Sequence, residues 1–272
     1  SILALSFTAA CGSGQSTASN STDSDDITQQ TYKPGKLTIA TGQPAYEPWV
    51  MNDKPESGEG YEAAVAYAVA DKLGFKKSDV VWTRTAFDTA IAPGAKDWDF
   101  NIQQFGITDE RKKAVDFSSS YYNDSQSVVV KKDSKFANVT KVSDLKNATV
   151  GVMVGTLAYD YAKANIKDDI QTFNDDAALA QALDAGQIDA LVTSTVECVY
   201  MVQSEQVKDA KVLGRLPDSE DKSGMGIVLP KDSKLTAAVT KAVDDLNADG
   251  TIKKLQDKWL AEYTTDLTEL KK

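Results

Sequence analysis

Arg111 is well suited to hold a small carboxylate. A guanidinium is always charged and can donate to both carboxylate oxygens at once. Arg111 ends the stretch 99–111, which reads as a buried strand, a short polar turn with a glycine, and a helix start capped by Thr108. The alternative is that Arg111 is a solvated helix charge that pairs with Asp116.

The composition excludes several classes of protein. The 272 residues include 30 basic and 40 acidic side chains, for a net charge of −10. This balance argues against binding of nucleic acid and against a basic membrane-binding surface. The chain has no histidine, which removes Ser-His-Asp triads and most catalytic zinc sites. The acidic pairs 168–169 and 175–176 lack the spacing of calcium loops and are predicted as turn and helix-cap residues. We expect no metal and no cofactor.

Two aromatic residues, Tyr46 and Trp49, lie in a proline-punctuated loop after the first predicted strand, residues 37–40. Open α/β folds bind ligands at the carboxyl ends of their strands. We therefore expect these rings to pack over a ligand. The alternative is that the loop packs into the core.

The N-terminal residues 1–35 predict a truncated leader, a lipid-attachment site and a flexible tether. Residues 1–10 are mostly apolar or small and precede Cys11, as in a bacterial lipoprotein signal, although Thr8 stands where that pattern usually has leucine. Residues 12–31 contain one large apolar side chain, Ile27, which is too little to order the segment. An ordinary secretory signal with a chance cysteine is the alternative. Cys198 is predicted to be a packed thiol.

Strands and helices alternate in two series along the chain, which predicts two α/β lobes with mostly parallel sheets. The first lobe is predicted over residues 36–127 and the second over residues 128–223. Residues 224–272 would return to the first lobe and end in two helices. Crossings near Ser127 and Gly224 would form a hinge, and such a body can close around a small solute.

Several different short motifs follow one another along the chain. They are residues 37–40, 46–49, 60–62, 106–113, 115–118, 121–122, 144–146, 150–152, 155–156, 186–190, 249–251 and 258–259. Their order and spacing resemble the extracytoplasmic solute-binding proteins of polar amino-acid ABC transporters. The resemblance covers residues 36 to about 263 and implies the two-lobed type II periplasmic-binding-protein fold.

The resemblance also implies a ligand pocket between the lobes. Arg111 would hold the α-carboxylate of an amino acid, helped by the amide of Gly106 and by Thr156 at a helix N-terminus. Gln104 would offer its backbone carbonyl to the ammonium group, and the pair Gln103 and Gln104 is similar to the Asn-Gln pair of cystine-binding members. The apolar wall over the ligand side chain would consist of Tyr46, Trp49 and Phe87.

Two positions depart from the family's pattern for the ammonium group of the ligand. Gly106 stands where the family usually has a Ser or Thr, and Ser194 stands where the second lobe usually has an aspartate. A buried ammonium without partners is costly. Either Glu47, Glu62 or Glu197 compensates, or the ligand lacks a standard α-ammonium, so the sequence leaves the ligand open.

The resemblance implies a lipid-anchored, monomeric receptor on the outer face of the cell membrane that delivers an amino acid to an ABC permease. One alternative is an enzyme of the dehydratase or lytic type, with Glu62 or Glu197 as general acid. The other is a ligand-sensing ectodomain. The lack of histidine and of a paired-carboxylate motif argues against the enzyme.

Overall fold

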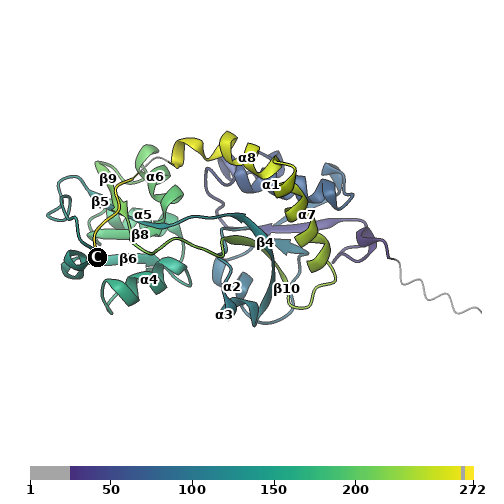
Figure 1. Ribbon diagram of the computed structural model, residues 1–272, viewed down its shortest axis with the longest axis horizontal. Coiled ribbons are helices and arrows are strands. Elements are labelled where there is room, and N and C mark those ends of the chain that lie inside the picture. Colours follow the sequence, from purple (N-terminus) through teal and green to yellow (C-terminus); the bar gives the residue numbers. More distant parts are fainter. Residues whose placement is uncertain (1–24, 265–266) are drawn as a thin grey trace, which may run out of the picture.

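The computed structural model describes residues 25–264 and 267–272 and has two lobes, each built around one five-stranded sheet (Figure 1). The first sheet has the order β2 (Val80–Arg84), β1 (Leu37–Thr41), β3 (Phe100–Asn101), β10 (Met225–Pro230) and β4 (Val115–Tyr122). The second has the order β7 (Gln171–Phe173), β6 (Val150–Met153), β8 (Ala190–Ser194), β5 (Gln126–Lys131) and β9 (Ala210–Arg215). The predicted α/β fold with two lobes is confirmed, and each sheet is mixed, with both parallel and antiparallel strand pairs.

Helices flank both sheets. Those of the first lobe are α1 (Tyr61–Lys72), α2 (Phe87–Ile91), α3 (Asp109–Lys112), α7 (Thr236–Ala248) and α8 (Thr251–Trp259). Those of the second lobe are α4 (Leu157–Asn165), α5 (Asp176–Asp184) and α6 (Thr195–Gln203). Short 3₁₀ turns are η1 (Ile27–Gln29), η2 (Met51–Asp53), η3 (Pro55–Ser57), η4 (Lys77–Asp79), η5 (Val142–Asn147) and η6 (Ala261–Tyr263).

The pairing directions bring the carboxyl ends of several strands to one edge of each sheet. Strand β1 is parallel to β2 and β3, and β6 is parallel to β7 and β8. The strands next to the crossings, β10 and β5, run antiparallel to their neighbours. Polar turns that follow the parallel strands therefore gather at one edge of each lobe, where α/β sheets bind ligands.

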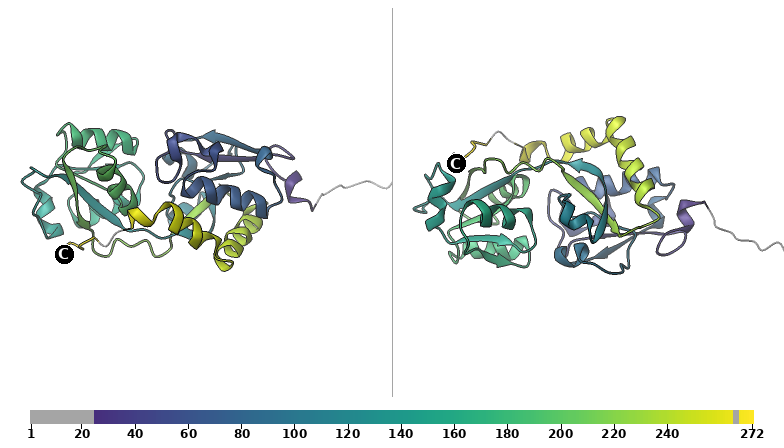
Figure 2. Two further views of the ribbon diagram at one scale, coloured as in Figure 1. Left: turned by 90° about the horizontal axis from the view of Figure 1, so that it is seen from above. Right: turned by 60° about the horizontal axis from the view of Figure 1, so that its bottom comes forward.

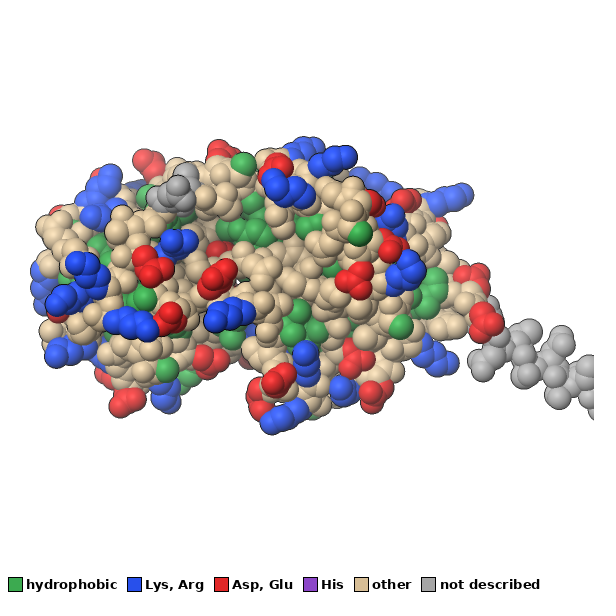
Figure 3. Space-filling view, in the orientation of Figure 1, with side chains coloured by type: hydrophobic (Ala, Val, Ile, Leu, Met, Phe, Trp, Pro, Cys, Tyr) green, Lys and Arg blue, Asp and Glu red, His purple; other side chains and the backbone are tan. Residues whose placement is uncertain are grey.

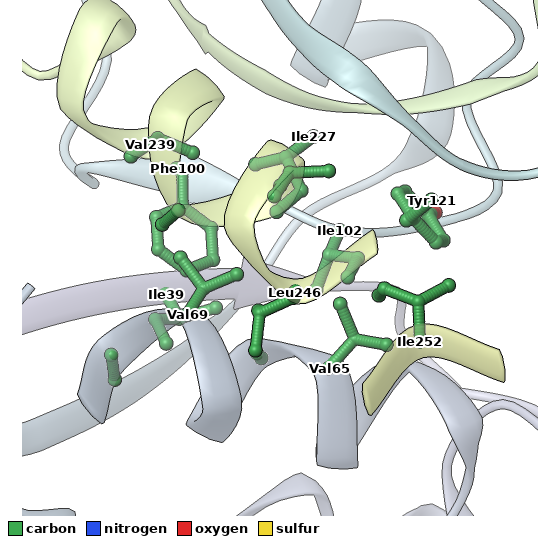
Figure 4. Packing of buried hydrophobic residues seen from close by; sticks show 14 of the residues in the cluster. Ile39, Val65, Val69, Phe100, Ile102, Tyr121, Ile227, Val239, Leu246 and Ile252 are labelled. Atoms are coloured by element: carbon green, nitrogen blue, oxygen red, sulfur yellow. The ribbon is translucent and has the colours of Figure 1, made fainter. Parts of the chain in front are cut away.

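The core of the first lobe lies between its sheet and the helices α1, α7 and α8 (Figure 4). The apolar face of α1 is buried, and Val65 and Val69 on it have no exposed surface. These side chains meet Phe100 from the sheet and Leu246 from α7 in one cluster. This contact ties the C-terminal helices to the lobe that the chain builds first.

The lobes are joined by three connections. Residues 123–125 lead from β4 to β5, and residues 216–224 lead from β9 to β10. In addition, Glu269 and Lys271 pair with Arg215 and Lys141 of the second lobe. The marked C-terminus lies on the second lobe, whereas α7 and α8 cover the first (Figure 1 and Figure 2).

The C-terminal residues depart from the prediction that residues 224–272 belong wholly to the first lobe. Gly214 leaves room beside β9, since a Cβ there would lie 2.6 Å from the carbonyl oxygen of Thr268. Leu270 is 4% exposed and joins a core cluster of the second lobe. The tail therefore adds to the second sheet edge through backbone bonds and one apolar anchor.

The ordered body also begins before the predicted boundary at residue 36. Ile27 packs against the core of the first lobe, and Asp26 caps its 3₁₀ turn. The carboxyl group of Asp99 accepts from the amides of Tyr32, at 2.6 Å, and Thr38, at 2.7 Å. A single apolar residue and one buried acceptor thus hold a segment that its composition predicts to be tether. Cys11 lies outside the described residues.

The surface carries mixed charges. On the face shown in Figure 3, blue and red side chains are interspersed over both lobes, and the outline is indented between them. Within the described residues, none of the helices combines the length and apolar character needed to cross a membrane.

Candidate functional site

A cavity of about 210 Å³ lies between the two lobes. Its walls come from segments that follow β1 and β3 in the first lobe and from the starts of α4, α5 and α6 in the second. The predicted site residues that line it are Tyr46, Phe87, Gln103, Gln104, Gly106, Arg111, Thr156 and Ser194. The fold thus brings together residues from positions 46 to 194.

Arg111 reaches from the first lobe to the second. One guanidinium nitrogen, Nη1, donates to the carbonyl oxygen of Gly106 at 2.7 Å, and Nη2 donates to that of Gly155 at 2.7 Å. The guanidinium also lies 5.6 Å from the ring centre of Phe87. Burial lowers the pKa of Arg111, but an arginine side chain keeps its charge in proteins.

The alternative that Arg111 pairs with Asp116 on the surface is wrong. Asp116 instead lies 3.3 Å from Lys231 Nζ and accepts from Thr236 Oγ1 at 2.8 Å. The predicted helix start is present, since Thr108 Oγ1 accepts from the amide of Arg111 at 3.1 Å. The cap fixes the backbone of Arg111, so its side chain enters the cavity from a defined point.

Three helices of the second lobe begin at the cavity. Thr156 caps α4 and accepts from the amide of Tyr159 at 3.2 Å. Ser194 caps α6, and Asp175 caps α5, as predicted for that residue. Unpaired amides at helix N-termini favour anions. The start of α4, next to Gly155, places such amides beside the guanidinium of Arg111.

Trp49 does not line the cavity, contrary to the prediction. Its ring is fully buried in the first lobe, 6.0 Å from the ring of Tyr61 and 5.7 Å from that of Tyr122. The carbonyl of Trp49 accepts from the amide of Glu62 at 2.9 Å, which binds the loop to the start of α1. The core-packing alternative therefore holds for Trp49.

Tyr46 and Phe87 form the aromatic part of the first-lobe wall. Phe87 stacks on Phe105 with ring centres 4.5 Å apart. Tyr46 OH accepts from the amide of Ala177, at the start of α5, at 3.1 Å. Burial raises the pKa of Tyr46, so the phenol stays neutral and this contact also joins the lobes.

Glu62 supports the polar turn rather than facing the cavity. Its carboxyl group is fully buried and accepts from the amide of Gln104 at 2.8 Å, from Gln104 Nε2 and from Tyr121 OH. Burial raises its pKa to about 7. Gln104 has a φ of 52°, a conformation costly for a residue other than glycine. The bonds to Glu62 hold this turn in place.

Glu47 lies at the margin of the gap. Its Oε2 accepts from Tyr200 OH of the second lobe at 3.1 Å, and its Oε1 accepts from the amide of Asn52 at 3.0 Å. Neither Glu47 nor Glu62 is among the residues that line the cavity. Of the three glutamates predicted as compensating acids, the cavity wall contains Glu197.

Five carboxyl groups line the cavity, a feature that sequence reasoning largely missed. They belong to Asp124, Asp175, Asp176, Glu197 and Asp221. Arg111 is the one cation among the described residues that line it. Their positions in the sequence could have indicated them, because the acids at 124, 175–176 and 221 follow strands or lie in the crossings between the lobes.

Two of these acids, Asp124 and Asp221, belong to the segments that connect the lobes. Asp124 accepts from the amides of Ser125, at 2.7 Å, and Val196, at 3.3 Å, and burial raises its pKa to about 6. Asp221 accepts from the amide of Gly224 at 3.0 Å. Burial raises the pKa of Asp221, while the charge of Arg111 opposes that shift.

Asp221 and Leu157 occupy the space beside Gly106. A Cβ at Gly106 would lie 2.5 Å from Leu157 Cδ1 and 3.0 Å from Asp221 Oδ2. The position thus needs glycine in this closed arrangement. A carboxylate from the second crossing therefore lies next to the place that a side chain at position 106 would occupy.

Two lobes that enclose a cavity with a fixed guanidinium and helix N-termini define a small-molecule receptor of the type II periplasmic-binding-protein class. The chain belongs to family 3 of the bacterial extracellular solute-binding proteins, whose model matches residues 37–262. Its homologues are amino-acid-binding proteins of ABC transporters.

Relatives of known specificity cover most of the chain. The L-cystine-binding protein TcyJ of Escherichia coli (strain K12) is 29% identical over 223 residues, 81% of this chain and 81% of that protein. The L-arginine-binding protein of Pseudomonas aeruginosa is 29% identical over 245 residues, 84% of this chain and 88% of that protein.

Solved structures give the same fold. An ancestral arginine-binding protein bound to arginine has a TM-score of 0.71 and 31% identity, over 83% of this chain and 98% of that one. An ancestral amino-acid-binding protein described as a precursor of cyclohexadienyl dehydratase has a TM-score of 0.68 and 30% identity, over 83% of this chain and 95% of that one.

Proposed function

We propose that this protein is a monomeric extracytoplasmic receptor that binds an amino acid between its lobes and delivers it to the permease of an ABC importer. The observation that carries the proposal is the position of Arg111, whose guanidinium bonds to carbonyl groups of both lobes. A carboxylate bound there would contact the first lobe through Arg111 and the second through the start of α4. Only a ligand that touches both lobes favours the closed form.

The relatives support this proposal and narrow the ligand. They include binders of L-cystine and of L-arginine, both of which carry an α-carboxylate and an α-ammonium. We propose that Arg111 and the helix start at Thr156 hold the carboxylate. Asp221, beside Gly106, would accept the ammonium in place of the hydroxyl and aspartate that this chain lacks.

Titration calorimetry with the proteinogenic amino acids and cystine tests the carboxylate site. We expect Arg111→Ala to weaken every ligand by about 30-fold or more, because removing one partner of a buried charge pair costs about 2–5 kcal/mol. Lys113→Ala is the matched control on the same turn, since that lysine is exposed and pairs with Glu110. Unchanged affinity in Arg111→Ala would rule out the proposed clamp.

Binding without turnover is the second part of the proposal. An ancestral neighbour is described as a precursor of a dehydratase, so an enzyme is the competing function. Of the two glutamates named as general acid, Glu62 sits outside the cavity wall with its oxygens engaged by Gln104 and Tyr121. Glu197 lines the cavity, so the enzyme alternative depends on Glu197. We expect ligand recovered after prolonged incubation to be unaltered by NMR, and any new product would favour the enzyme.

We also propose that Cys11 carries a lipid that tethers the receptor to the outer face of the cell membrane. The support is the apolar stretch before Cys11 and the polar stretch after it. In bacterial cells that export the protein, Cys11→Ser should release it into the soluble fraction and abolish incorporation of labelled palmitate. Retention in the membrane would contradict the anchor.

A further inference from the structure

The cavity contains more acidic side chains than are needed to bind the α-ammonium of a ligand. Asp221 lies close enough to Arg111 for the two charges to interact, so it belongs to the end that would hold the α-carboxylate and α-ammonium. Glu197 and Asp176 lie at the starts of α6 and α5, on the second-lobe wall. Trp49 Nε1, from the first lobe, donates to Glu197 Oε2 at 3.3 Å.

Both of these side chains keep an unsatisfied oxygen. Glu197 is 2% exposed and Asp176 is 8% exposed. Within the described part of the chain, Glu197 Oε1 and Asp176 Oδ1 are buried without a hydrogen-bond partner. A buried acceptor without a donor is unfavourable, and a buried carboxylate without a counter-charge is more so. Each oxygen would be satisfied by a donor on a bound ligand.

We propose that Glu197 and Asp176 form a subsite for a cationic group on the side chain of the ligand, so that the receptor prefers basic amino acids. This inference rests on the proposed function, because the α-carboxylate must be held by Arg111 for the side chain to extend toward the acids. An ammonium or guanidinium supplies several charged donors and no acceptors, which matches two carboxylates.

The same geometry disfavours other ligands. A side-chain carboxylate, as in glutamate, would meet Glu197 and Asp176 with no cation between them. A neutral side chain would leave the pair without a counter-charge. The pair is also a poor metal site, since calcium takes six to eight oxygen ligands. In the described ranges no three acidic, cysteine or histidine side chains are grouped to hold a metal.

The proposal is tested with ligand pairs that differ in charge but little in shape. L-Arginine and L-citrulline form one pair, L-lysine and L-norleucine form the second, and L-glutamate is the dicarboxylate probe. In titrations of the whole protein, the cationic member should bind at least 100-fold more tightly than its neutral partner, and glutamate should bind no better than the neutral ligands.

Two isosteric variants then locate the preference. Glu197→Gln and Asp176→Asn should each reduce the ratio between arginine and citrulline to below about tenfold, mainly by weakening arginine. Glu56→Gln and Asp133→Asn are matched controls, because both residues are exposed and outside the cavity wall. The controls should keep the full ratio.

The possible outcomes separate the two proposals. If the wild-type protein binds no amino acid, both the proposed function and this inference are overturned. If amino acids bind but citrulline or glutamate matches arginine, the subsite is wrong and the receptor stands. A ratio that stays above 100-fold in both folded variants also overturns the subsite. The wild-type ratios decide the matter even where a variant fails to fold.

Discussion

The side chains of neighbouring residues fill the space that a side chain at Gly106 would need. A Cβ at this position would meet Leu157 and Asp221 at 2.5 and 3.0 Å, although Gly106 and Leu157 belong to different lobes. Added volume here would therefore act on closure of the lobes rather than on the folding of either lobe.

A variant that restores the family's hydroxyl at this position should bind more weakly. Because overpacking of a closed contact costs about 1–3 kcal/mol, Gly106→Ser should raise the dissociation constant roughly tenfold or more in calorimetry. The thermal midpoint without ligand should change little. Adding Leu157→Ala should recover most of the loss, and wild-type affinity in the single variant would contradict this account.

Buried carboxyl groups give a predicted pH dependence of stability. Burial raises the pKa of Glu62 from 4.5 to about 7, that of Asp124 to about 6 and that of Asp176 to about 7. Between about pH 4.5 and 7 the folded protein keeps protons that the unfolded chain has released, so stability falls as the pH rises. Asp249, with a pKa of about 2, acts in the opposite direction only in acid.

We therefore expect the ligand-free protein to melt at a higher temperature at pH 5 than at pH 8, as measured by calorimetry. Glu62→Gln should flatten the slope of melting temperature against pH, because the amide does not titrate. The slope is compared rather than the midpoint, since the variant also alters hydrogen bonds to Gln104. A flat wild-type profile would show that these groups titrate normally.

Among the elements, those with regular apolar spacing were predictable and those with irregular exposure were not. Val65 and Val69 lie four residues apart, about one helical turn, and both are buried on α1. Strand β4 was not recognised as one eight-residue strand, because its buried positions recur every third residue rather than every second. The short strand β3 carries the turn before Arg111, and its sequence pattern was clear.

Those features of the candidate site that depend on local sequence patterns could be predicted. The helix cap at Thr108 and the helix start at Thr156 are local features, so the positions of Arg111 and α4 could be inferred. The burial of Asp176 could not be inferred, because an acid in the first turn of a helix is ordinary and acids are mostly exposed. The prediction that Trp49 contacts the ligand was wrong, because an aromatic side chain in a loop can turn either toward the core or toward the ligand.

The helix α7 offers a test of the first-lobe core that is separate from the site. Leu246 is 3% exposed and packs in the cluster with Val65 and Val69. Leu246→Ala should lower the free energy of unfolding by about 2–5 kcal/mol in denaturant titrations, with little change in ligand affinity. Asp244→Ala, on the exposed face of the same helix, should stay within about 0.5 kcal/mol. Equal effects would place Leu246 outside the core.

At the scale of the whole molecule, the C-terminal tail gives the lobes a connection besides the two hinge strands. The amide of Arg215 donates to the Thr268 carbonyl at 2.9 Å, and the Leu270 amide donates to that of Arg215 at 2.9 Å. The side chain of Leu270 anchors this pairing in the second lobe. The tail thus protects an edge of the second sheet.

Detachment of the tail should be visible in amide hydrogen exchange. Leu270→Asp removes the apolar anchor, so exchange at Arg215 should rise about tenfold or more while exchange in β1 stays unchanged. Lys272→Ala is the control, because its ion pair with Asp218 is exposed and contributes little. Unaltered exchange at Arg215 in Leu270→Asp would mean that the backbone bonds alone hold the tail.

The bond from Arg111 to the Gly155 carbonyl has a consequence for the heat of capture. Nη1 and Nη2 of Arg111 donate to carbonyl oxygens of the two lobes. A guanidinium has five N–H donors, so a carboxylate can share Arg111 with these carbonyls or take the place of one of them. Where it takes the place of a carbonyl, one bond is lost for each bond gained, and the enthalpy of binding would be smaller than the number of new bonds suggests.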